Sequence, residues 1–244
     1  MEASIICCYY NEINLLESKL KPFIDYLQKK KLEIEVIIVD NNSNDGSSEF
    51  LKKMSEEQND INIKFIFNNK NLGKGGSIKK ACLNASGKIA CIFDIDEYSY
   101  EDLFKGIDYF KDNNIDLLVG SRILEKKIFI YKKNLYGVIA LTTLINKLYN
   151  LKLTDAAGAT KLFRLDLYKK TKIFTSGFDF EFELICKFAK KEYIIKEFHN
   201  NYDPRTYAEG KKINPWKDGV KILLTIIRSY FIWKKYLLQV DMEF

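Results

Sequence analysis

The chain has 244 residues, of which 47% are hydrophobic and 30% are charged, a composition that is ordinary for a globular protein. This length allows one large domain or two small ones, with a core that needs no disulfide or metal to fold. The net charge of +6 suits nucleotides, phosphates or an anionic membrane surface. It falls short of the dense basic stripe of a dedicated nucleic-acid-binding protein.

The first hundred residues alternate between strand-like and helix-like segments. We expect strands at 4–10, 34–40, 63–67 and 89–93, and helices at 13–30, 47–54 and 78–85. This order predicts an α/β fold with a mostly parallel sheet that is flanked by helices on both faces. Ligands bind to such sheets beyond the carboxyl ends of the strands. Polar clusters follow three of these strands, at 11–12, 40–45 and 94–97.

The second half of the chain has a weaker pattern. We expect strands at 115–122 and 192–198, a loop and a strand within 154–164, and helices at 134–151 and 180–191. The segment 218–238 is typical of an apolar helix that basic residues interrupt. We therefore expect one domain over residues 1–215 and an amphipathic helical tail over residues 216–244.

The five cysteines are odd in number, form no CxxC pair and lie in apolar runs. This pattern predicts reduced core residues of a cytoplasmic protein rather than disulfides or a zinc site. The start of the chain has no basic region of the kind that opens a signal peptide. No apolar segment reaches the ~18–20 uncharged residues that cross a bilayer.

Asp94 and Asp96 directly follow the apolar run 89–93. Two carboxylates at such a strand end are typical of a divalent cation site, and their hard oxygen ligands suit Mg²⁺ or Mn²⁺ bridging to a substrate diphosphate. The alternative is a surface loop with an aspartate turn. The buried strand that precedes them favours the metal site.

Three other polar segments are ambiguous by themselves. Asp40, in the run DNNSNDG, suits a hydrogen bond to a nucleoside or a role in helix capping. The glycine-rich segment 71–77 suits anion binding or tight packing, and it has neither the P-loop nor the dinucleotide spacing. The basic segment 205–212 suits phosphate contacts or a solvated charge run. The lone His199 is expected to be structural.

Together these segments resemble the family 2 glycosyltransferases with the GT-A fold, over most of the chain from Ser4 to about Arg228. VDNNSNDGS at 39–47 resembles their VDDGSxDGT turn, with Asn41 in place of the second aspartate. The block 71–96, NLGKGGSIKKACLNASGKIACIFDID, is a more specific match. YDPRTYAEGKKINPWKDG at 202–219 resembles the tail of bacterial enzymes close to dolichol- and polyprenol-phosphate mannosyl- or glucosyltransferases.

The resemblance implies an inverting transfer of a hexose from a UDP- or GDP-sugar, assisted by Mg²⁺ or Mn²⁺. The acceptor would be a polyprenyl phosphate or a hydroxyl of a glycan or lipid. The implied nucleotide-binding residues are Tyr10, Glu12, Asp40, Asn42, Lys74 and Asp94. The implied metal ligands are Asp94 and Asp96, and the implied acceptor or phosphate contacts are Arg122, Arg205, Lys211 and Lys212.

The type of acceptor decides whether a base is needed. A hydroxyl acceptor needs a general base, for which Asp155, Glu181 and Glu183 are the candidates. A lipid phosphate is already a nucleophile and needs cations instead. The tail carries an apolar stripe, which fits an interfacial helix on the cytoplasmic face of a membrane or, equally, a core helix or a dimer face.

Two rival functions share parts of this pattern. A nucleotidyltransferase on a similar sheet would use the same pair of carboxylates and release pyrophosphate. A non-catalytic basic module for nucleic acid or membrane would tolerate Asp94→Asn and Asp96→Asn. We expect the transferase, with a nucleotide-sugar donor and no nucleic-acid partner, and the oligomeric state is open.

Overall fold

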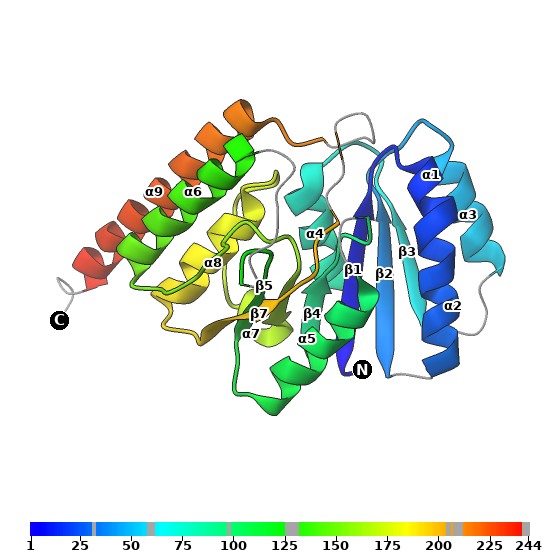
Figure 1. Cartoon of the computed structure of the whole chain (residues 1–244), viewed down its shortest axis with the longest axis horizontal. Coiled ribbons are helices and arrows are strands. Elements are labelled where there is room, and N and C mark those ends of the chain that lie inside the picture. Colours follow the sequence, from blue (N-terminus) through cyan, green and yellow to red (C-terminus); the bar gives the residue numbers. More distant parts are fainter. Residues whose placement is uncertain are drawn as a thin grey trace.

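The computed structural model describes residues 1–30, 33–57, 62–96, 99–124, 132–203, 206 and 212–240. At residues 29–30, 132–133 and 232–240 it describes the backbone alone. Over these ranges a single sheet runs through the molecule, with helices on both of its sides (Figure 1).

The strands of this sheet are short, and most of their residues are buried. They are β1 (Ala3–Tyr9), β2 (Ile34–Asp40), β3 (Ile63–Phe67), β4 (Ile89–Ile92), β5 (Leu117–Ser121), β6 (Lys161–Arg164) and β7 (Ile195–His199). Over the described residues these seven strands lie in the order β3-β2-β1-β4-β6-β5-β7.

The helices follow the strands in the expected alternation through the first half of the chain. They are α1 (Ile13–Leu15), the π-helical turn η1 (Leu16–Leu20), α2 (Lys21–Lys30), α3 (Ser47–Glu57), α4 (Gly73–Asn84), α5 (Tyr100–Asp112), α6 (Lys132–Tyr149), α7 (Leu165–Lys169), α8 (Phe180–Lys190) and α9 (Pro215–Val240). None of the described helices combines the length and the apolar character needed to cross a bilayer.

The sheet is mostly parallel, as the sequence predicts. Strand β1 pairs in parallel with β2 and β4, β2 with β3, and β5 with β7. Only β6 runs antiparallel among the described strands, to β4 on one side and β5 on the other. Because β1 lies between β2 and β4, the carboxyl ends of these three strands meet at one edge of the sheet.

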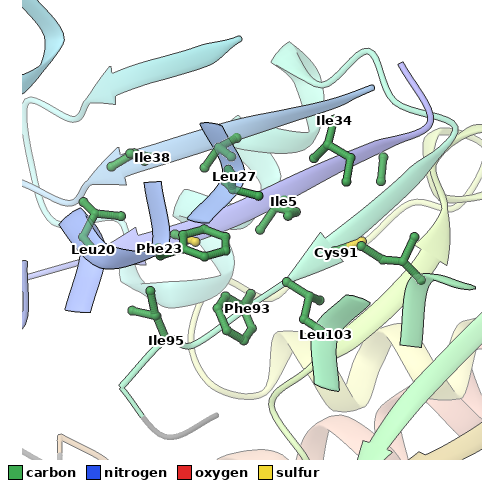
Figure 2. Packing of buried hydrophobic residues seen from close by; sticks show 14 of the residues in the cluster. Ile5, Leu20, Phe23, Leu27, Ile34, Ile38, Cys91, Phe93, Ile95 and Leu103 are labelled. Carbon is green, nitrogen blue, oxygen red and sulfur yellow. The ribbon is translucent and has the colours of Figure 1, made fainter. Parts of the chain in front are cut away.

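Strand residues alternate between two cores, one on each face of the sheet. On one face Ile5, Ile38 and Cys91 pack against Phe23 and Leu103, which come from α2 and α5 (Figure 2). On the other face the strands pack against α4, α6, α7, α8 and α9. All five cysteines are free and four of them are buried, as predicted.

Helix α5 has no counterpart among the expected elements. Ser99 begins it, since its side-chain hydroxyl accepts a hydrogen bond from the backbone N–H of Glu101. Its apolar residues Leu103, Ile107 and Phe110 are buried at helical spacing. The sequence signal was therefore present, and the charged residues between these positions obscured it.

The C-terminal helix α9 begins at Pro215, next to the expected boundary of the tail. Its first half is not a separate appendage, because Ile222 and Ile226 are buried in the second core. The Thr225 hydroxyl donates to the carboxylate of Asp179 at 3.1 Å, at the start of α8. Of the three alternatives for the tail, the core helix therefore describes this inner face.

Candidate functional site

A cavity of 1390 Å³ opens at the carboxyl edge of the sheet. Its polar wall comes from the residues after β1 and β4 and from the first turn of α4. Its apolar wall comes from α6 and α9. The sequence-predicted residues that line it are Tyr10, Glu12, Lys74, Asp94, Asp96, Arg122, Glu181 and Lys212.

Lys74 links the two sides of the polar wall. Its ammonium lies 2.5 Å from Asp94 Oδ2 and 2.8 Å from Glu181 Oε1. Burial lowers the pKa of Lys74, but the carboxylates of Asp94 and Glu181 outweigh burial and hold this pKa well above its usual range. The charged side chain therefore joins the end of β4 to the start of α8.

The backbone before Lys74 is held in a conformation that favours glycine. Gly73 has a φ of +74°, and a Cβ added there would lie 2.4 Å from the carbonyl oxygen of Ser176. Its N–H donates to the side chain of Asn71 at 2.8 Å. Because a side chain fits poorly on both counts, the place of Lys74 depends on this glycine.

Glu181 is held between two ammonium groups. Besides Lys74 it contacts Lys161, whose ammonium lies 3.1 Å from Glu181 Oε2 and donates to the Gly158 carbonyl at 2.5 Å. Burial raises the pKa of Glu181, but Lys161 and Lys74 outweigh burial and hold it below its usual range. Burial lowers the pKa of Lys161 itself, despite its partner. A carboxylate held in this way is a weak proton acceptor.

Arg122 lies in the cavity wall with its guanidinium bound to Asp155. Nε and Nη2 donate to the two carboxylate oxygens at 2.7 and 2.9 Å, and the guanidinium stacks over the Tyr202 ring at 5.1 Å. Asp155 is fully buried and lies outside the cavity lining. Its segment passes so close to β5 that a Cβ on Gly158 would lie 1.8 Å from the carbonyl oxygen of Gly120.

The turn after β2 supports one wall of the cavity, which only its residue Asn41 lines directly. Asp40 is buried, and its carboxylate accepts hydrogen bonds from the Ser48 hydroxyl at 2.5 Å and from the Ser43 N–H. Neither Asp40 nor Asn42 lines the cavity. Asn42 adopts a φ of +65°, which asparagine tolerates better than most residues. Asp40 and Asn42 therefore stabilise the conformation of the turn.

Asn41 does line the cavity and fastens two segments together. Its amide donates to Asn71 at 2.9 Å, and its oxygen accepts from Asn68 and from the Leu72 N–H. The VDDGSxDGT turn that this segment resembles has an aspartate here, which could not donate. The substitution noted in the sequence therefore serves the packing of the glycine-rich segment.

Lys212 reaches the end of β1 from the segment before α9. Its ammonium donates to the Tyr10 carbonyl and pairs with the Glu12 carboxylate, and it lies 5.6 Å from the centre of the Tyr10 ring. The other two predicted basic residues, Arg205 and Lys211, lie outside the described residues. The structure thus brings one of the three basic residues of this segment to the cavity.

Glu183 lies away from the cavity. Its carboxylate accepts hydrogen bonds from the Phe174 and Thr175 N–H groups and pairs with Lys187 at 2.6 Å. Burial raises the pKa of Glu183, but its pair with Lys187 and its hydrogen bonds outweigh burial and lower it. The side chain holds a loop onto α8, and nothing in its position suits a general base.

The apolar wall forms a groove between α6 and α9, which run side by side (Figure 1). Leu141 and Leu144 line it from α6, and Ile222 and Leu223 from α9. Each helix also places a glycine in this wall, and a Cβ added at Gly137 or Gly219 would meet nothing within 4 Å. The groove therefore has open space along both helices.

Sequence reasoning missed two parts of this site. One is Lys161, whose signal was a single lysine at the start of an apolar strand. The other is the contribution of α6, which was expected only as an amphipathic helix. The pairing of α6 with α9 needs the fold, because the two helices lie far apart in the sequence.

Residues 4–172 match the family profile described as "Glycosyl transferase family 2". The chain belongs to this family. The predicted resemblance is thereby confirmed, and the protein is a family 2 glycosyltransferase.

Curated relatives of this glycosyltransferase include two dolichyl-phosphate beta-glucosyltransferases. The one from Dictyostelium discoideum is 27% identical over 258 residues, which cover 95% of this chain and 76% of the relative. The human one is also 27% identical, over 252 residues that cover 94% of this chain and 76% of the relative. This glycosyltransferase thus matches about three quarters of each relative.

Solved structures show the same GT-A fold. Glucosyl-3-phosphoglycerate synthase from Mycobacterium tuberculosis, solved with Mn²⁺, UDP and phosphoglyceric acid, has a TM-score of 0.68 at 14% identity, covering 94% of this glycosyltransferase and 78% of that chain. A mannosyltransferase from Pyrobaculum calidifontis, solved with GDP-Man and Mn²⁺, has a TM-score of 0.56 at 17% identity. The match covers 94% of this glycosyltransferase and 70% of that chain. The expected fold class is confirmed.

Proposed function

We propose that this glycosyltransferase moves a hexose from a nucleotide-diphosphate sugar to a polyprenyl phosphate, with inversion at the sugar. The observation that carries this proposal is the continuity of one cavity. It joins the acidic end of β4 to an apolar groove between α6 and α9. A substrate with a phosphate head and a hydrocarbon tail matches such a cavity at both ends, and the dolichyl-phosphate relatives support the same acceptor class.

The donor would lie at the polar wall. Tyr10 and Glu12 would contact the nucleotide, while Asp40 and Asn42 would act through the turn that they shape. Complexes of the solved neighbours with UDP or GDP-Man support both bases as candidates, and the cavity by itself does not favour one. The hexose would then point toward Arg122 and the mouth of the groove.

Asp94 and Asp96 would hold Mg²⁺ or Mn²⁺ beside the diphosphate. Their carboxylate oxygens are ligands that both ions prefer. Among the residues that the structure describes, no group of three or more His, Cys, Asp or Glu side chains is placed to hold a metal. This donor set fits an ion that takes its other ligands from diphosphate and water. The ion would neutralise charge on the leaving diphosphate.

The surroundings of the candidate bases favour a phosphate acceptor. Of the three, only Glu181 lines the cavity. Lys74 and Lys161 keep its carboxylate ionised, and each of them pairs with one of its two oxygens. A phosphate oxygen needs no proton removed before it attacks the sugar carbon from the face opposite the leaving group. Arg122 and Lys212 would add positive charge where this head group lies.

The outer surface of the same two helices supports a peripheral place on a membrane. Tyr136 on α6 and Leu224 and Phe231 on α9 are exposed. Large exposed apolar patches mark interaction surfaces, and basic residues beside them suit anionic lipids. Over residues 215–231 of this helix, where side chains are described, the exposed basic residues are Lys217, Lys221 and Arg228. A lipid acceptor would enter the groove from such a membrane.

The proposal is tested by a direct assay with two donors. Purified protein is incubated with UDP-glucose or GDP-mannose, Mn²⁺ and a polyprenyl phosphate in detergent, and the products are identified by mass spectrometry. We expect a glycosyl-phosphate lipid and the free nucleoside diphosphate. Release of pyrophosphate would indicate a nucleotidyltransferase. Equal transfer to the unphosphorylated polyprenol would contradict the phosphate acceptor.

A further inference from the structure

Lys74 forms an ion pair with Asp94, the carboxylate that would bind the metal in the proposed reaction. Its ammonium lies 2.5 Å from Asp94 Oδ2, while Mg²⁺ sits about 2.0–2.1 Å from its oxygen ligands. Two cations bound to one carboxylate in a half-buried site repel each other strongly. A free metal ion therefore competes with Lys74 for Asp94.

Glu181 gives the ammonium a second place to bind. Its carboxylate forms an ion pair with Lys74 at 2.8 Å through one oxygen and with Lys161 at 3.1 Å through the other. These two lysines balance the charges of Asp94 and Glu181, so the group of four is neutral before any ligand arrives. Asp96, the second proposed metal ligand, adds one negative charge, so a divalent cation alone would still leave an excess of one positive charge. A diphosphate that enters with the ion restores the balance.

Resting on the function proposed above, we propose that Lys74 protects Asp94 against free divalent cations. The metal then enters only together with the diphosphate of the donor. When the ion binds Asp94, the ammonium stays on Glu181 and turns toward the diphosphate oxygens. Lys74 thus contacts the diphosphate of the nucleotide and also makes metal binding depend on that nucleotide.

The test measures Mn²⁺ binding without any turnover. Electron paramagnetic resonance of free Mn²⁺ gives the affinity of the wild type and of Lys74→Met, each with and without UDP or GDP. We expect the wild type to bind Mn²⁺ weakly unless nucleotide is present. Lys74→Met should bind Mn²⁺ alone at least about tenfold more tightly, which is the scale on which a neighbouring charge alters a carboxylate. The same variant should bind the nucleotide less tightly.

Two further variants control for loss of charge and for misfolding. Lys79→Met removes a lysine of the same helix whose ammonium donates to the Phe174 carbonyl and to Ser176, and it should behave as wild type. Lys74→Arg keeps the charge and should keep the weak binding of Mn²⁺ alone.

Two results would overturn the proposal for Lys74. One is wild-type protein that binds Mn²⁺ alone as tightly as with nucleotide, a measurement that needs no variant. The other is a folded Lys74→Met protein with no gain in affinity for Mn²⁺ alone. In both cases metal-dependent nucleotide binding by the wild type leaves the proposed function intact. Absence of that binding for both nucleotides would overturn the function and the role of Lys74 together.

Discussion

Arg122 and Asp155 bind each other through two parallel hydrogen bonds of 2.7 and 2.9 Å. The carboxylate is fully buried, while the guanidinium forms part of the cavity wall. Burial raises the pKa of Asp155, but Arg122 outweighs burial and lowers it. The pair is neutral as a whole, and it holds the guanidinium in the cavity wall beside the proposed path of the sugar.

Asp155→Ala should lower both stability and activity, because it leaves a buried guanidinium without its partner. We expect a loss of about 3–5 kcal/mol in the free energy of unfolding, measured by urea denaturation. The control is Asp166→Ala, which breaks the exposed pair with Arg164 and should cost less than about 1 kcal/mol. Equal losses for the two variants would contradict the structural weight given to Arg122 and Asp155.

Filling the groove should weaken lipid binding without touching the donor. Gly137→Phe and Gly219→Phe place an aromatic ring into open space on each wall. We expect the KM for polyprenyl phosphate to rise about tenfold or more, while calorimetric binding of nucleotide stays unchanged. Gly137→Ala and Gly219→Ala serve as small-volume controls. An unchanged KM in both phenylalanine variants would place the lipid elsewhere.

Replacing the carboxylates after β4 should remove metal-dependent nucleotide binding. Asp94→Asn and Asp96→Asn keep the size of each side chain and remove the charge that a hard cation needs. We expect at least a ~100-fold loss of affinity for the Mn²⁺ complex of the nucleotide, measured by calorimetry. A non-catalytic binding module predicts full retention of function in these variants.

Membrane binding should depend on the outer face of α9, and point substitutions test it better than truncation. Removing residues 220–244 would also remove the buried Ile222 and Ile226. Leu224→Ser and Phe231→Ser should each weaken sedimentation with anionic vesicles by about tenfold, since each removes an exposed apolar side chain whose burial in the membrane would contribute about 1.5–3 kcal/mol. Leu83→Ser changes a leucine on α4 that is more exposed than Leu224, and it should have no effect.

Glu35 should make stability depend on pH in the acid range. This buried carboxylate accepts hydrogen bonds from Ser4, Ser86 and Gly87 and pairs with Lys64 at 2.7 Å. Burial raises its pKa, but the pair with Lys64 and the hydrogen bonds lower it to about 2, against 4.5 in the free side chain. A lowered acid pKa stabilises the fold above pH 4.5, and this stabilisation disappears as the pH falls toward 2.

Glu35→Gln should therefore cost about 2 kcal/mol at pH 7. The difference from wild type should shrink between pH 4.5 and pH 2, where the wild-type carboxyl takes up its proton. Thermal unfolding followed by circular dichroism at several pH values measures it. A difference that stays constant down to pH 2 would show that the charge of Glu35 contributes nothing.

The sequence predicted those parts of the molecule that depend on local pattern. The β-α alternation and the polar strand ends placed Asp94 and Asp96 at the carboxyl edge, because that edge is common to all parallel strands. Partners distant in the sequence were not predictable. The sequence offered Glu181 and Asp155 as candidate bases, but it did not show that Lys74 and Lys161 pair with Glu181 or that Arg122 pairs with Asp155.

The amide of Asn41 bears on how this enzyme can be engineered. Family-guided redesign would restore aspartate at this position, where the related turn carries one. With aspartate at position 41, a carboxylate oxygen would face the side-chain oxygen of Asn71 in place of the amide nitrogen that now donates to it. The loop that precedes Lys74 would then lose this hydrogen bond. Asn41→Asp should therefore destabilise this protein, and Asn41, Asn68 and Asn71 should be transferred to another chain only together.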